Sequence, residues 1–142
     1  MAVPNRKALL EWAHNYVDLW NAGDKEAWTA NWKKVGPGEF RMLDPVGTPE
    51  KVGFEHCCLD SWGLFQDRVK FKFHNDIVLV NGNEVAWVLE NHITTDGDTM
   101  MSTSIETYRF EENGDVTIRT YYKVPARDDT ELGEMFQTYL PQ

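Results

Sequence analysis

The sequence predicts a single α+β domain spanning residues 1–142, in which N-terminal helices wrap a cone-shaped, curved antiparallel sheet made of a four-strand meander plus a short strand. Apolar residues recur at helical spacing through the first third of the chain. In the second half, runs rich in β-branched and aromatic residues alternate with dipeptides typical of tight hairpin turns: Asn81-Gly82, Asp96-Gly97 and Asn113-Gly114. Strands of this length twist, so the sheet should curve and leave a deep pocket between its concave face and the helices.

The first helix is expected from Asn5 to Asn21. Gly23 is a typical C-terminal stop, and Asp24 is a typical N-cap for a second helix that ends near Gly36. The apolar face of the first helix is formed by residues three and four positions apart: Leu9, Ala13, Tyr16, Val17 and Trp20. The buried face of this helix therefore carries a phenol among apolar residues.

A short strand over residues 39–44 is followed by a third helix, predicted from about Phe54 to Phe65. The meander is expected at Val69–Val80, Glu84–Thr94, Thr99–Phe110 and Val116–Val124. Residues 125–142 are interpreted as a C-terminal extension or lid, with a helix within Asp128–Leu140.

Composition excludes several classes of function. The net charge of −9 and the pI of about 4.8 disfavour nucleic acid and anionic membranes as partners. The chain shows no signal peptide, no membrane-spanning run and no disulfide spacing, since Cys57 and Cys58 are adjacent, and we expect a cytoplasmic protein. Metal-ligand spacings, phosphate loops and the serine-hydrolase nucleophile motif are missing, so neither a metal nor another cofactor is predicted.

Asp44 is the first candidate catalytic residue. Side chains alternate along a strand, so Phe40, Met42 and Asp44 should share one face, with the carboxylate at the end of an apolar stripe. A carboxylate in apolar surroundings shifts its pKa, finds a partner or serves chemistry. The alternative is that Asp44 caps the turn at Pro45.

Glu106 and Tyr16 are the other candidate catalytic residues. Glu106 shares a strand face with Ser104 and Tyr108, and a carboxyl group held in a dry pocket can stay neutral and donate a hydrogen bond. A shift of one residue in the register of this strand would turn Glu106 outward. Tyr16 could instead be a core residue whose hydroxyl group bonds to the backbone.

We expect the wall of the pocket to be aromatic with few polar groups, because pockets for flat organic ligands favour aromatic side chains. Parity with Leu89 places Asn91 rather than His92 toward the interior. The sequence leaves open which face of the last strand looks inward. The predicted substrate-binding residues are Trp20, Phe40, Met42, Trp62, Trp87, Asn91, Tyr108 and Tyr121.

Two segments of the chain form a recognisable pattern: Asn15-Tyr16-Val17-Asp18-Leu19-Trp20-Asn21-Ala22-Gly23-Asp24 and Asp44-Pro45-Val46-Gly47. They resemble the ketosteroid isomerases, which belong with the SnoaL-like polyketide cyclases to the cone-shaped nuclear transport factor 2-like superfamily. The likeness extends over most of residues 9–124. The resemblance implies Asp44 as general base, with Tyr16 and Glu106 as hydrogen-bond donors to an oxyanion. Glu106 stands where the isomerases have aspartate. The resemblance also implies a homodimer formed through the convex face of the sheet.

These observations predict a cofactor-independent acid–base enzyme acting on a hydrophobic, ring-containing small molecule. The reaction would be of isomerase or lyase/dehydratase type, including retro-aldol cleavage of an aromatic compound. The alternative is a non-catalytic module of the same fold that binds a small molecule or a protein. A third hypothesis is epoxide hydrolysis by a carboxylate-activated water, with Arg119 nearby.

Overall fold

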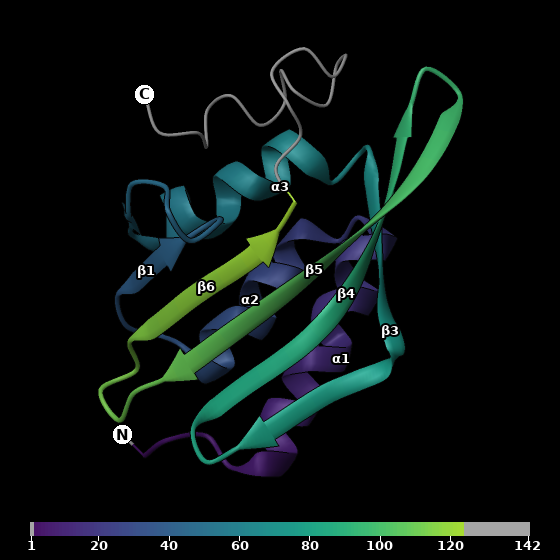
Figure 1. Cartoon of the computed structure of the whole chain (residues 1–142). Coiled ribbons are helices and arrows are strands. Elements are labelled where there is room, and N and C mark those ends of the chain that lie inside the picture. The colour runs from purple at the N-terminus through teal and green to yellow at the C-terminus, as the bar shows by residue number, and fades with distance from the viewer. Residues whose placement is uncertain (1, 124–142) are drawn as a thin grey trace.

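The computed structural model describes residues 2–123, which form three helices, one π-helical turn and six strands (Figure 1). The helical elements are α1 (Arg6–Ala22), α2 (Lys25–Val35), η1 (Glu55–Leu59) and α3 (Asp60–Phe65). The strands are β1 (Phe40–Leu43), β2 (Lys51–Val52), β3 (Val69–Asn81), β4 (Glu84–Thr95), β5 (Asp98–Phe110) and β6 (Val116–Tyr122). The predicted helix over residues 54–65 is thus a π-helical turn followed by an α-helix. The extension or lid at 125–142 lies outside the described residues.

The helix boundaries follow from local capping. The side chain of Asn5 accepts a hydrogen bond from the backbone of Ala8 at 2.9 Å, and Asp24 caps α2 in the same way at 3.0 Å. Gly23 adopts the left-handed conformation, with φ of 73°, that ends many helices. The caps predicted at Gly23 and Asp24 are therefore confirmed.

The six strands form one open, curved sheet in the order β2-β1-β6-β5-β4-β3. The β3–β6 meander is antiparallel as predicted, whereas β1 pairs with β6 in parallel, with Phe40 opposite Val116. The sheet is therefore mixed rather than purely antiparallel, and β2 adds a strand that the sequence did not indicate. Hydrophobic periodicity identifies a strand but not its partner across 70 or more residues, and a strand of two residues such as β2 is too short to show a period.

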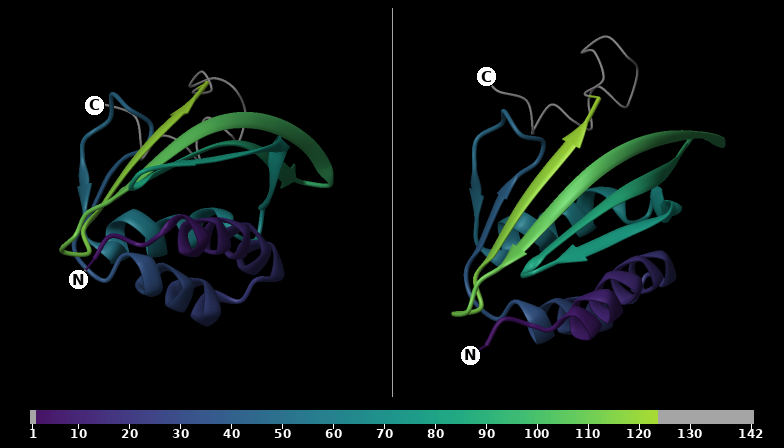
Figure 2. Two further views of the ribbon diagram at one scale, coloured as in Figure 1. Left: turned by 90° about the horizontal axis from the view of Figure 1, so that it is seen from below. Right: turned by 60° about the horizontal axis from the view of Figure 1, so that its bottom comes forward.

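The helices lie against the concave side of the sheet, and the sheet bends over them (Figure 2). A register shift in β3 between Phe73 and Val78 accompanies this bend. Helix α1 is fixed to β3 by two side-chain bonds: Trp20 donates to the carbonyl of Val69 at 2.9 Å, and Asn21 donates to that of Phe71 at 2.8 Å. The α+β class and the curved sheet covered by N-terminal helices are confirmed.

The core is mainly aromatic. The indole of Trp12 lies 4.8 Å from that of Trp32 and 5.3 Å from that of Trp87, measured between ring centroids. Tight contacts of this kind hold α1 and α2 against the sheet. No helix within residues 2–123 is both long and apolar enough to cross a membrane.

Candidate active site

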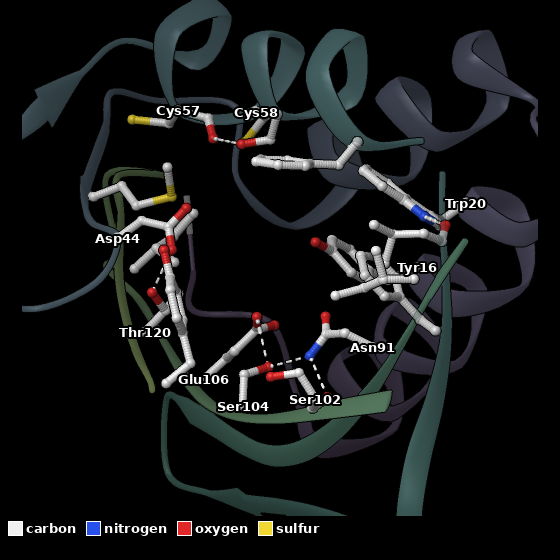
Figure 3. Close-up of a pocket in the computed structure, with 18 of the residues that line it drawn as sticks. Tyr16, Trp20, Asp44, Cys57, Cys58, Asn91, Ser102, Ser104, Glu106 and Thr120 are labelled. Carbon is white, nitrogen blue, oxygen red and sulfur yellow. Dashed lines mark hydrogen bonds between the residues drawn. The ribbon is translucent and has the colours of Figure 1, made fainter. Parts of the chain in front are cut away.

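A cavity of about 570 Å³ opens between the concave face of the sheet and the helices (Figure 3). Aromatic and aliphatic side chains form most of its wall, including Trp20, Phe71 and Ile118. Asp44, Glu106 and Tyr16 all line it, and Figure 3 shows them pointing into the same space from different walls. The cavity therefore combines an apolar surface with a small set of convergent polar groups, the usual composition of a small-molecule site.

Asp44 follows directly after β1, where the parallel pairing with β6 carries it beside Thr120. The hydroxyl of Thr120 donates to Oδ1 of Asp44 at 2.5 Å, and the amide of Val46 donates to the Thr120 carbonyl at 2.9 Å. Burial raises the pKa of Asp44, while the Thr120 bond, the charge of Lys51 and a hydrogen bond with Tyr122 counteract part of that rise. Asp44 is thus a fixed carboxylate with increased basicity, as a general base requires.

Lys51 is the cation whose positive charge lowers the pKa of Asp44. It lies in β2 directly opposite Met42 of β1, on the same inward face, and its side chain is almost fully buried. Burial lowers the pKa of Lys51, and the Asp44 carboxylate is the main group that counteracts this shift. The two charges stabilise one another within the wall.

Glu106 accepts three hydrogen bonds, distributed unevenly over its two oxygens. Trp87 and Tyr108 donate to Oε1 at 2.7 and 2.8 Å, whereas Ser104, at 3.4 Å, is the only donor to Oε2 within residues 2–123. Burial raises the pKa of Glu106 to about 7, against the effect of the Trp87 and Tyr108 bonds. A proton on this carboxyl group therefore resides on Oε2, from which it can be donated into the cavity.

Tyr16 extends this group of donors. Its ring lies 6.3 Å from that of Tyr108, measured between centroids, and Tyr108 donates its own proton to Glu106. Burial, followed by the negative charge of Glu106, raises the pKa of Tyr16 well above its ordinary value. The phenol therefore stays protonated and can donate to a ligand oxygen across the physiological pH range.

Two adjacent cysteines, Cys57 and Cys58, also line the cavity, because the π-helical turn η1 lies along its upper wall in Figure 3. Burial raises the pKa of Cys57 to about 12 and that of Cys58 well above its ordinary value. Neutral thiols are poor nucleophiles, so these cysteines contribute wall surface rather than covalent chemistry. Within the described part of the chain, no three His, Cys, Asp or Glu side chains are grouped to hold a metal ion.

The predicted substrate-binding residues fall into three groups. Trp20, Met42, Asn91 and Tyr108 line the cavity, whereas Phe40, Trp62 and Trp87 are buried behind its wall. Trp87 nevertheless acts on the site, because it holds Glu106. The placement of Tyr121 in the pocket was wrong: it lies on the outer face of β6 with 43% of its surface exposed.

The opposite face of β6 supplies the lining residues that the sequence analysis left undecided, namely Ile118, Thr120 and Tyr122. Thr120 is the important residue that the sequence analysis missed. The sequence does contain a signal for its inward direction, because Thr120 shares a strand face with the apolar Ile118, whereas Tyr121 shares the other face with charged residues. Arg119 shares the outer face with Tyr121, to which it donates at 3.2 Å, so it does not reach the cavity as the epoxide hypothesis required.

Comparisons with known proteins agree with this architecture. No protein-family model and no curated protein sequence matches the chain. A protein from Jannaschia sp. CCS1 described as a SnoaL-like polyketide cyclase is similar in structure, with a TM-score of 0.66 and 16% identity over 84% of this chain and 88% of that one.

Two further solved structures are similar. The epoxide hydrolase/cyclase-like enzyme SalBIII, which acts in pyran ring formation in the polyether salinomycin, has a TM-score of 0.66 and 16% identity over 84% of this chain and 93% of its own. The protein RV0760c from Mycobacterium tuberculosis has a TM-score of 0.63 and 17% identity over 85% of this chain and 95% of its own. The chain therefore has the nuclear transport factor 2-like fold of the SnoaL-like cyclases.

Proposed function

We propose that the protein is a cofactor-independent enzyme that moves a proton on a hydrophobic, ring-containing small molecule. The observation that carries the proposal is the pairing of two carboxyl groups in one largely apolar cavity, Asp44 on one wall and Glu106 on another. Their environments give them different roles. The positive charge of Lys51 and the Thr120 bond counteract part of the rise in the pKa of Asp44, whereas the pKa of Glu106 rises to about 7, so that Glu106 remains partly protonated near neutral pH.

In this mechanism Asp44 removes a proton from a carbon next to a carbonyl group. The carbonyl oxygen becomes an enolate, which accepts hydrogen bonds from Tyr16 and from protonated Oε2 of Glu106. Return of the proton to another carbon completes an isomerisation. Loss of a β-hydroxyl group as water, with a proton supplied by a cavity acid, completes a dehydration.

A retro-aldol cleavage uses the same groups in a different order. Asp44 takes the proton of a β-hydroxyl group, the carbon–carbon bond breaks, and the electrons pass to the carbonyl oxygen held by Tyr16 and Glu106. The similar structures include a protein described as a SnoaL-like polyketide cyclase and an enzyme that acts in pyran ring formation, and this likeness supports a small organic molecule as the substrate.

Exchange of carbon-bound hydrogen in D₂O tests the proposal directly. A graded series of bicyclic, tricyclic and tetracyclic ketones, beginning with 2-tetralone, is first screened for binding through quenching of cavity tryptophan fluorescence. The tightest-binding ketone should then exchange the hydrogens next to its carbonyl at least about 10²-fold faster than with free acetate at equal carboxylate concentration, because the base and the oxyanion donors are preorganised. A ketone that binds but exchanges no faster than with acetate contradicts the proposal.

Replacement of Lys51 by Met should shift the pH dependence of this exchange. Lys51 stabilises the ionised form of Asp44, so its loss raises the pKa of that carboxyl group, and the acid limb of the rate profile moves to higher pH. Lys51→Arg keeps the positive charge and serves as the matched control. Profiles that coincide for Lys51→Met and the wild type would show that Lys51 does not set the basicity of Asp44.

The remaining expectations stand as proposals. A homodimer would cover the convex face of the sheet, where Ile105 and Tyr121 lie directly opposite each other and are about half exposed. We also propose a cytoplasmic location, a single domain and a lid role for residues 125–142.

A further inference from the structure

Asn91 is a polar residue on the apolar inward face of β4. It shares this face with Leu89 and Ile93, both of which are buried. On the neighbouring strand β5 it lies directly opposite Ser102. Its side chain lines the cavity. The acid–base mechanism above assigns this amide no task.

The hydrogen bonds of Asn91 fix which way its amide group faces. Nδ2 lies 3.1 Å from the carbonyl oxygen of Ser102, 3.0 Å from Oγ of Ser104 and 3.5 Å from the carbonyl oxygen of Leu89. Backbone carbonyl groups only accept hydrogen bonds, so a flipped amide would place oxygen against oxygen. The nitrogen must therefore face the strands and the oxygen must face away from them.

Oδ1 of Asn91 is consequently a fixed acceptor in the cavity wall. Figure 3 shows it on the cavity side of the amide, between the Ser102–Ser104 wall and Tyr16. Among residues 2–123, no side chain or backbone group donates a hydrogen bond to this oxygen. The hydrogen bond between Ser104 and Asn91 is made to Nδ2, so Ser104 does not donate to Oδ1.

We propose that Asn91 is a specificity-determining residue that accepts a hydrogen bond from a hydroxyl or N–H group of the bound molecule. This inference rests on the proposed function for naming the ligand as a substrate. It narrows the substrate class to ring compounds that carry a donor on the edge facing β4 and β5, in addition to the oxygen held by Tyr16 and Glu106. A compound that lacks such a donor displaces water from Oδ1 without replacing the hydrogen bond that water donates, and this loss weakens its binding.

The ligand pairs for the test are the 6-hydroxy and 7-hydroxy derivatives of 2-tetralone, each compared with its methyl ether. A methyl ether keeps the ring and the carbonyl group but cannot donate. Dissociation constants are measured by tryptophan fluorescence for the wild type, Asn91→Leu and Ile93→Val. The last variant changes the size of the same wall without touching the amide and is the matched control.

We expect at least one hydroxyl compound to bind the wild type about tenfold more tightly than its ether, a difference equivalent to about 1.4 kcal/mol. This preference should fall to within about twofold in Asn91→Leu and persist in Ile93→Val. An equal preference in Asn91→Leu, or none in the wild type, overturns the inference. A preference that disappears in Asp44→Asn and persists in Asn91→Leu also overturns it, because the donor then goes to the carboxylate.

A crystal structure of the wild type with the preferred hydroxyl compound gives a second reading that does not depend on the folding of Asn91→Leu. The ligand hydroxyl should lie within hydrogen-bonding distance, about 2.6–3.2 Å, of Oδ1 of Asn91. A hydroxyl placed elsewhere contradicts the inference. Because these measurements record binding alone, a hydroxyl preference without isotope exchange would refute the proposed catalysis and leave the role of Asn91 supported.

Discussion

Replacement of Asp44 by Asn is expected to slow the exchange of ketone hydrogens by about 10²–10⁴-fold, the usual contribution of a positioned general base. The amide cannot take a proton at neutral pH. The substitution keeps the shape of the side chain and an oxygen that accepts from Thr120. The dissociation constant of the ketone should therefore change far less than the rate.

Folding provides the control for this variant. Removal of the charge relieves the burial cost that raises the pKa of Asp44, but it also takes from the buried Lys51 the group that offsets its own burial, so the melting temperature should change little. Thr120→Val leaves the carboxylate in place but removes the hydroxyl that orients Asp44 and counteracts part of the rise in its pKa. Exchange by Asp44→Asn within about tenfold of the wild-type rate would exclude Asp44 as the base.

The second large effect is expected at Glu106, in the pH dependence of stability. Its pKa rises from the ordinary 4.5 to about 7 on folding, so the folded protein binds the proton more tightly than the unfolded chain between these values. Stability attributable to this group is therefore fully present below about pH 4.5 and is lost as the pH rises through about 7. The loss is on the order of 3 kcal/mol, given about 1.4 kcal/mol for each pH unit between the two pKa values.

Glu106→Gln should remove this pH dependence. The amide oxygen can still accept from Trp87 and Tyr108, and the amide nitrogen takes the place of protonated Oε2. Urea unfolding at pH 5, 6, 7 and 8 should show the variant gaining stability relative to the wild type as the pH rises, with the gain levelling off above about pH 8. Parallel stability curves for the two proteins would mean that Glu106 is not a buried acid with a raised pKa.

The same variant separates two catalytic roles of Glu106. If Oε2 serves as a hydrogen-bond donor, Glu106→Gln should exchange ketone hydrogens within about tenfold of the wild-type rate, whereas Glu106→Leu should lose about 10²–10³-fold. Wild-type exchange should also decline above about pH 7, as the acid ionises, and this decline should be absent in Glu106→Gln. Equal loss in both variants would indicate that a carboxylate, rather than a neutral donor, is required.

Local sequence determined most of the helices and strands, and it determined that three side chains of the candidate site point inward. Capping residues and apolar spacing fixed the first two helices, since both depend on neighbours within a few positions. Alternation along strands correctly placed Asp44, Glu106 and Asn91 on inward faces, because one buried face constrains the register of the whole strand. In β6 aromatic residues occur on both faces, which left the choice open, although the charged Arg119 and Lys123 beside Tyr121 indicate that this face is the outer one.

Only the tertiary structure decided how these side chains meet. The parallel pairing of β1 with β6 joins Asp44 to Thr120 across 76 positions, and no local pattern encodes a partner at that distance. The packing of aromatic rings put Phe40, Trp62 and Trp87 behind the wall and left Trp20 and Tyr108 on it. The proton on Glu106 and the orientation of the Asn91 amide depend on hydrogen bonds from neighbouring residues and strands, so they are properties of the folded cavity that the sequence alone does not specify.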